Sequence, residues 1–294
     1  MKLNIMITEI QIMLKRKTFW FSFIFLLLFS ILTTGYNLCK YWGLSYDDTA
    51  SPYFMYILND ANSYSNILTT IFPFVIILPF AMSHAVDCSK NSHIFFLVSR
   101  CTRKEYFTAQ AFVTFLGSFV IIVIPALLNI VLNYIVFAEN TKCPGWGEMY
   151  TSNFLNSVTG VNADLQETHY GFYFKKLFLF HPMAHNVLFA MNAGVLAGVL
   201  AVFGYGCSFY FRKNRIYIFM PVFIVLQVLG MISAAMYLNV DKLRVYINLY
   251  ILQYVLSGFF TNGKNYIVYY IFLIIISIIS IGLILRKIQE EELK

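Results

Sequence analysis

Charged residues are scarce in this chain. Lys, Arg, Asp and Glu make up 12% of its 294 residues, whereas hydrophobic residues make up 59%. A water-soluble domain carries about 25% charged residues, because polar groups must cover its surface. The apolar residues gather in runs of about 20, long enough as helices to cross a hydrocarbon core of roughly 30 Å. The composition therefore excludes a soluble globular domain and predicts an all-α polytopic membrane protein.

Cationic residues are also missing from the interior of the apolar runs. All 21 Lys and Arg residues lie between the runs or near the ends of the chain. Charges inside a membrane usually mark ion paths, proton relays or catalysis, so their absence disfavours a proton-coupled transporter or an intramembrane hydrolase. The net charge of +7 does not indicate nucleic-acid binding, because the cations stand in small groups at the ends of runs rather than in one stripe.

Sequence motifs for nucleotide and metal sites are absent as well. No G-x-x-x-x-G-K-[ST] phosphate loop occurs, so ATP hydrolysis is not expected on this chain. Five cysteines are present without a C-x-x-C spacing, which argues against a zinc or redox centre. His181 and His185 are four residues apart, but no carboxylate or thiolate stands near them in the sequence, and we predict no metal site.

The order of apolar and polar stretches predicts a single transmembrane domain over residues 1–294. Pro73 and Pro79 are expected to kink the second span, because proline removes backbone hydrogen bonds. The predicted elements are an interfacial amphipathic helix (1–17), six transmembrane helices (18–36, 65–86, 108–137, 183–211, 216–238 and 266–285), a connector between helices two and three (87–107), an extracellular lobe (138–182) and a re-entrant element (246–260).

The distribution of charge predicts the orientation of these helices. With both termini in the cytoplasm, the inside segments hold 14 Lys and Arg residues and the outside segments hold 7. Acidic residues divide as 6 inside and 8 outside. This is the bias that cytoplasmic loops show, so we expect a multi-pass protein of the bacterial cell membrane with cytoplasmic N- and C-termini. Cys39 and Cys143 both fall outside, and a disulfide between them is left open.

The 87–107 connector is the most informative polar segment. It places Lys90, Arg100, Arg103 and Lys104 around a short apolar run, residues 94–98, which is too short to span a membrane. Two interpretations are open: a positively charged loop that only sets topology, or a short helix that docks on a soluble motor protein. Either Ser99 or Thr102 is expected to cap the helix that leads into the third span.

The whole layout resembles the permease subunits of ATP-binding-cassette transporters of the type-2 exporter family, whose fold is shared with the G-subfamily half-transporters. In that family the connector has an acidic residue, an apolar stretch, then Ser-Arg and an aromatic residue. The matching residues here are Asp87, Ile94 to Val98, Ser99-Arg100 and Tyr106. The chain departs from the family at Ala109-Gln110, where Gly-Lys is common.

The resemblance implies a coupling helix that seats in a separate cytoplasmic ATPase, which would carry ATP and magnesium. It also implies a dimer with an identical or a sister permease, with a substrate path between helices two and five of the two copies. The implied coupling residues are Asp87, Phe95, Phe96, Ser99, Arg100, Arg103, Lys104 and Glu105. The implied path residues are Thr69, Phe72, Phe223 and Gln227. An apolar path suits amphipathic substrates such as antimicrobial peptides or bacteriocins, lipids or drugs.

Two other functions remain open at this point. The first is a membrane sensor or assembly partner without transport, which would use the 138–182 lobe to bind its ligand or partner. The second is a membrane-embedded enzyme, for which the lobe and its end supply Asp164, Glu167, His169 and His181 without a recognised spacing. A neighbouring reading frame that encodes an ATPase favours the transporter, and one that encodes only a histidine kinase favours the sensor.

Overall fold

The computed structural model describes residues 2–44, 49, 51–59, 62–83, 102–138, 174, 177, 181–210, 215–239, 248–257 and 266–292. Within these ranges the regular structure is helical, which confirms the predicted all-α class, and the only strand-like pairing there is an isolated bridge between Asn59 and Ser257. Most of the 87–107 connector and of the 138–182 lobe lies outside the described residues.

Five of the helices are long and apolar enough to cross a membrane, which is consistent with a membrane protein. They are α2 (Lys17–Lys40), α6 (Arg103–Val136), α10 (Pro182–Ser208), α11 (Phe219–Asn239) and α13 (Tyr266–Glu292). The shorter elements are α1 (Lys2–Leu14), α3 (Ser63–Ile77) and the 3-10 helices η2 (Arg215–Ile218) and η3 (Ile251–Val255).

The second predicted span, 65–86, differs from expectation in length. Its helix, α3, has 15 residues and is followed by turns over residues 78–82. At 1.5 Å per residue, α3 measures about 22 Å, which is short for a hydrocarbon core of roughly 30 Å. Pro79 follows two residues after the last helical residue, and a proline there cannot continue the helical hydrogen bonding. Ser118 of α6 donates a hydrogen bond of 2.6 Å to the carbonyl oxygen of Ile76 next to this break.

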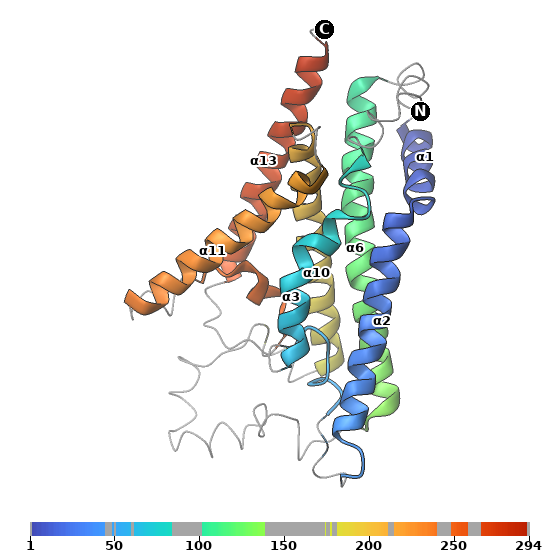
Figure 1. Ribbon diagram of the computed structural model, residues 1–294, viewed down its shortest axis with the longest axis vertical. Helices are drawn as coiled ribbons and strands as arrows, with labels where there is room; N and C mark the ends of the chain where they lie inside the picture. The colour runs from blue at the N-terminus through green and yellow to red at the C-terminus, as the bar shows by residue number, and fades with distance from the viewer. Residues whose placement is uncertain are drawn as a thin grey trace.

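The long helices form a bundle centred on α6 and α10 (Figure 1). Helices α1 and α2 pack against α6, whereas α13 packs against α10. The small residues of α10 permit close approach of the two helices, since Gly194 lies against Val123 and Phe119 of α6, and Gly198 lies against Phe115.

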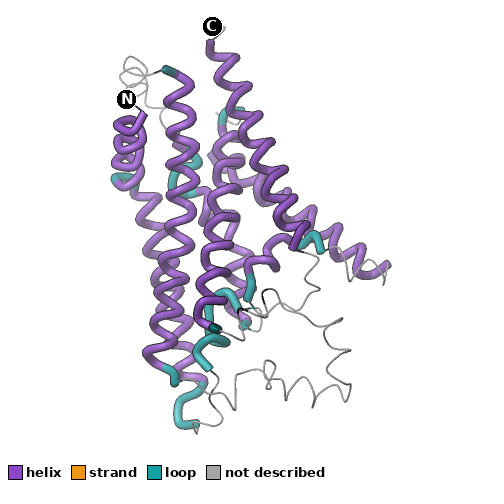
Figure 2. Tube along the Cα trace, turned by 180° about the vertical axis from the view of Figure 1, so that it is seen from behind, coloured by secondary structure: helices purple, strands orange, loops and turns teal. Residues whose placement is uncertain are grey.

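Two features of the arrangement bear on function. First, α1 and the last turns of α13 lie at the same end of the molecule (Figure 1). Second, α11 leans away from the rest of the bundle, as both views show (Figures 1 and 2).

Candidate functional site

The first turn of α6 is the described part of the predicted coupling region. The backbone amide of Glu105 donates to Oγ1 of Thr102 at 3.3 Å, and the amide of Thr102 donates to Oε2 of Glu105 at 3.2 Å. This capping box satisfies two amides that a helix start leaves free, and it confirms Thr102 as a helix cap. Arg103 is half-buried beside it, and Lys104 is exposed. The other predicted coupling residues lie outside the described residues: Asp87, Phe95, Phe96, Ser99 and Arg100.

A buried polar network joins this first turn to two other helices. The amide oxygen of Gln110 accepts a hydrogen bond from Tyr205 of α10 at 2.9 Å. The amide nitrogen of Gln110 donates to the Tyr106 hydroxyl at 2.7 Å and to the Glu9 carboxylate of α1 at 3.5 Å. None of the four side chains is more than 1% exposed. Buried polar groups that satisfy one another fix the relative positions of their helices, so α1, α6 and α10 are held together at this end.

The four predicted path residues lie on two neighbouring helices. Thr69 and Phe72 of α3 are buried, and the Thr69 hydroxyl donates to the carbonyl of Asn66 at 3.0 Å. On α11, Phe223 is half-buried and Gln227 is exposed. The two helices meet through Phe74, whose ring centroid lies 5.6 Å from that of Phe223. Within one chain, therefore, α3 and α11 are adjacent, and only the α11 residues are accessible from outside the bundle.

A non-helical segment, residues 51–59, is enclosed between the helices, and we call it the strap. All nine of its residues are buried. Non-helical backbone inside a membrane protein needs hydrogen-bond partners from the protein, because lipid supplies none. Side chains of four elements supply them. The Asn186 side chain donates to the carbonyl of Tyr53, and the Asn62 side chain donates to the carbonyls of Phe54 and Tyr56. The side chains of Asn37, Tyr64 and Asn133 all donate to the carbonyl of Met55. These hydrogen bonds measure 2.7–3.2 Å.

Asn129 of α6 is the centre of the hydrogen bonds around the strap. Its amide oxygen accepts from the backbone amide of Ile57 at 2.8 Å and from Asn133 at 3.1 Å. Its amide nitrogen lies 3.1–3.2 Å from three oxygens of α2, those of the Ser30 carbonyl and of the Thr33 and Thr34 hydroxyls. One side chain thus joins α2, α6 and the strap.

The far end of the strap meets the segment predicted as re-entrant, 246–260, of which residues 248–257 are described. The amide of Ser257 donates to the carbonyl of Leu58 at 2.7 Å, across about 200 residues of sequence. Asn248 accepts from Ser233 of α11 at 3.0 Å, and the Tyr254 hydroxyl donates to the Asn248 carbonyl at 2.7 Å. The described part of the segment contains one 3-10 helix, η3, and lies buried between α10, α11 and α13.

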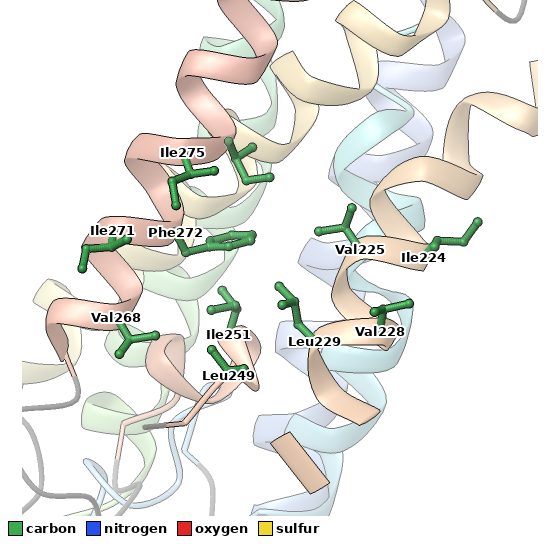
Figure 3. A pocket seen from close by; sticks show the side chains of 11 residues that line it. Ile224, Val225, Val228, Leu229, Leu249, Ile251, Val268, Ile271, Phe272 and Ile275 are labelled. Carbon is green, nitrogen blue, oxygen red and sulfur yellow. The ribbon is translucent and has the colours of Figure 1, made fainter. Parts of the chain in front are cut away.

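A groove opens on the other side of that segment, between α11 and α13 (Figure 3). Its volume is about 440 Å³, and Leu249 and Ile251 of the segment close one end. Every described residue that lines it has a hydrocarbon side chain: Ile224, Val225, Val228, Leu229, Leu249, Ile251, Val268, Ile271, Phe272, Ile275 and Ile276. None of these described residues could hold an ion or take part in acid–base chemistry.

Sequence reasoning missed the strap, the Glu9 contact and this groove. The asparagines around the strap come from separate elements, and no spacing in the sequence connects them. A repeated occurrence of single Asn residues within apolar runs, as at Asn129, Asn133 and Asn186, is the one signal that points to them, because an unpaired amide in hydrocarbon is costly. The groove forms because α11 leans away from the rest of the bundle. No local feature of the sequence predicts that lean.

The remaining candidate residues do not form a catalytic or metal-binding cluster. Among the described residues no group of three or more His, Cys, Asp or Glu side chains is placed to hold a metal ion. His181 is exposed, whereas His185 is buried with its ring 4.7 Å from that of Phe189. Cys39 is an exposed free thiol at the end of α2, and Cys143 lies outside the described residues, so their pairing stays a prediction.

Comparison with known proteins gives no family assignment. No family model, no curated protein and no solved structure matches this chain.

Proposed function

We propose that this chain is the membrane-spanning permease subunit of an ATP-driven exporter, and that a separate cytoplasmic polypeptide binds ATP and magnesium. The proposal rests on the structure of the first turn of α6. The connector leads directly into a capped, basic helix end, and the Gln110 network ties that end to α1 and α10. Force applied to the connector would therefore move three helices as one body.

Six crossings fit the arrangement better than five. The two ends of the chain lie at one end of the molecule, and an even number of crossings is needed for that (Figure 1). The sixth crossing is α3 together with the turns over residues 78–82, an interrupted span that α6 and α10 shield. The positive ends of the helices then face the cytoplasm of a bacterial cell, as the distribution of Lys and Arg indicates.

The proposed substrates are amphipathic molecules such as peptides, lipids or drugs, because α3 and α11 carry apolar and aromatic side chains and no charged residue. A path between α3 of one copy and α11 of a second copy would include the exposed Gln227 and the half-buried Phe223. The second copy is either an identical chain or a sister permease.

Thiol labelling tests the orientation. A variant that keeps Cys39 as its only cysteine is expected to react with a membrane-impermeant maleimide in intact cells, because Cys39 is exposed at the end of α2 opposite to α1. An Arg103→Cys change in the cysteine-free chain is expected to react only after the cells are permeabilised. Labelling of Cys39 only from the cytoplasmic side, or of position 103 from outside, contradicts the proposed topology and removes the contact with a cytoplasmic motor.

Co-purification tests the function itself. The tagged chain, extracted from its native host in mild detergent, is expected to bring down a polypeptide with a phosphate loop and with ATPase activity. The double change Arg103→Glu, Lys104→Glu is expected to reduce the amount of recovered ATPase at least fivefold, because it inverts the positive charge at the C-terminal end of the connector. Arg286→Glu is the control, since Arg286 is a basic residue of α13 whose side chain is 73% exposed and pairs with Glu290 of the same helix at 3.2 Å.

The outcomes of the co-purification separate the candidate functions. Recovery of no nucleotide-binding subunit from the native host contradicts the exporter. Equal loss of the ATPase in the Arg286 control shows that net charge, rather than the α6 start, determines the association. In the first case the chain would have to act through another partner, as the sensor hypothesis requires.

A further inference from the structure

The α11–α13 groove is continuous with the surface that these helices present to the membrane. Both walls belong to helices that are long and apolar enough to cross it. The residues along the rim are about half exposed: Ile224 (52%) and Val228 (45%) on α11, and Ile271 (50%) and Ile275 (49%) on α13. In a bilayer such residues contact lipid chains, so the bilayer is the medium from which an occupant enters the groove.

The chemistry of the lining restricts the occupant to hydrocarbon. All eleven lining residues are Ile, Val, Leu or Phe. A peptide backbone or a lipid headgroup placed there would lose its hydrogen bonds to water without replacement, which costs several kcal/mol for each group. An alkyl chain loses nothing on entry and fills space that would otherwise lack dispersion contacts.

The size of the groove corresponds to one chain in one leaflet. An apolar cavity of about 150 Å³ holds a benzene molecule, and this groove has a volume of about 440 Å³. On α13 it runs from Val268 to Ile276, a rise of about 12 Å. Half of a hydrocarbon core of roughly 30 Å is about 15 Å, so the groove is about as long as one leaflet is thick.

We propose that the α11–α13 groove binds a single acyl chain of a phospholipid from the outer leaflet. The leaflet rests on the orientation given with the proposed function, because the groove lies along the first turns of α13, the half of that helix farther from the end of the molecule that carries α1 (Figure 1). The binding of the chain is independent of any ATPase. The lipid supports α11, which leans away from the bundle (Figure 1) and is mostly unburied by the described residues.

Photo-crosslinking tests the site on the purified full chain in detergent. The probe is a phosphatidylglycerol with a diazirine at the middle of one acyl chain, added at an equimolar ratio and mapped by mass spectrometry after illumination. We expect about one probe per chain, attached to the lining residues of α11 and α13. Val228→Trp and Ile271→Trp, one from each wall, are expected to lower this labelling at least fivefold because the indole fills the groove.

Two tryptophan variants on the same helices serve as controls. Met231→Trp of α11 and Ile278→Trp of α13 replace side chains that are 69% and 65% exposed and do not line the groove. Both should keep the labelling of the wild type. Equal labelling in all four variants, or probe spread evenly over exposed residues of α2 and α6, overturns the site. All variants are compared as monodisperse fractions, and either groove variant alone suffices if the other does not fold.

The leaflet is tested separately. The same probe, introduced from outside into the outer leaflet of intact cells, is expected to label the groove. In inverted vesicles, where the probe first reaches the other leaflet, short exposures should label it at least fivefold less. Equal labelling from both sides overturns the assignment to the outer leaflet. Neither result depends on whether an ATPase partner exists, so failure here and failure of the exporter hypothesis are distinguishable.

Discussion

Asn129→Leu is expected to lower the free energy of unfolding by about 3 kcal/mol, since it leaves several buried polar groups without partners. The backbone amide of Ile57 loses its acceptor, and the Ser30 carbonyl and two threonine hydroxyls of α2 lose a shared donor. Leucine has the same number and branching of side-chain heavy atoms as asparagine but a larger volume, so the loss combines missing hydrogen bonds with some overpacking of a buried site. All nine residues of the strap are buried, so water has little access to replace these hydrogen bonds.

Thermal unfolding of the purified chain in detergent measures this effect, with intrinsic fluorescence as the signal. Asn66→Leu is the matched control, because Asn66 is an exposed asparagine of α3 and the same chemical change there removes no buried bond. Asn129→Leu should also expose the strap to protease, whereas Asn66→Leu should not. An unfolding temperature for Asn129→Leu equal to that of the control would mean that the strap does not depend on this residue.

The sequence predicts the parts of the fold that depend on local properties. Long apolar runs yield α2, α6, α10, α11 and α13, because a helix satisfies its own backbone in lipid. The Thr102 cap follows from a threonine with glutamate three residues later. The end of α3 near Pro79 follows from the missing amide of proline, although the run of apolar residues suggested a longer span.

The sequence does not predict the parts that depend on contacts between distant elements. The strap lies in a stretch that reads as an ordinary loop, since the asparagines that hold it come from α2, α6 and α10. Burial of Tyr56 in the strap raises the pKa of its hydroxyl well above the usual value, so it stays neutral. Glu9 likewise reads as a solvated charge of an amphipathic helix, yet it is fully buried against Gln110. In each case tertiary packing determines the environment.

Gly194→Ala is expected to destabilise the chain by about 2 kcal/mol, because a methyl group at this position overfills the contact between α10 and α6. A Cβ atom there would overlap Cγ2 of Val123 and would lie 2.9 Å from Cδ2 of Phe119. Val123 is 5% exposed and β-branched, so its side chain has little freedom to turn away. The two helices would have to separate along the largest interface of the bundle, and the unfolding temperature in detergent should fall accordingly.

Two further variants separate this clash from the general effect of adding a methyl group to a helix. Gly282→Ala places the methyl where no atom lies within 4 Å, so it should leave stability unchanged or raise it by up to about 1 kcal/mol through helix propensity. Val123→Ala removes the group that Gly194→Ala collides with. The double variant Gly194→Ala, Val123→Ala should therefore be more stable than the sum of the single changes by at least about 1 kcal/mol. Strict additivity would show that α10 and α6 are not in contact at this pair, and the central packing of the bundle would then be wrong.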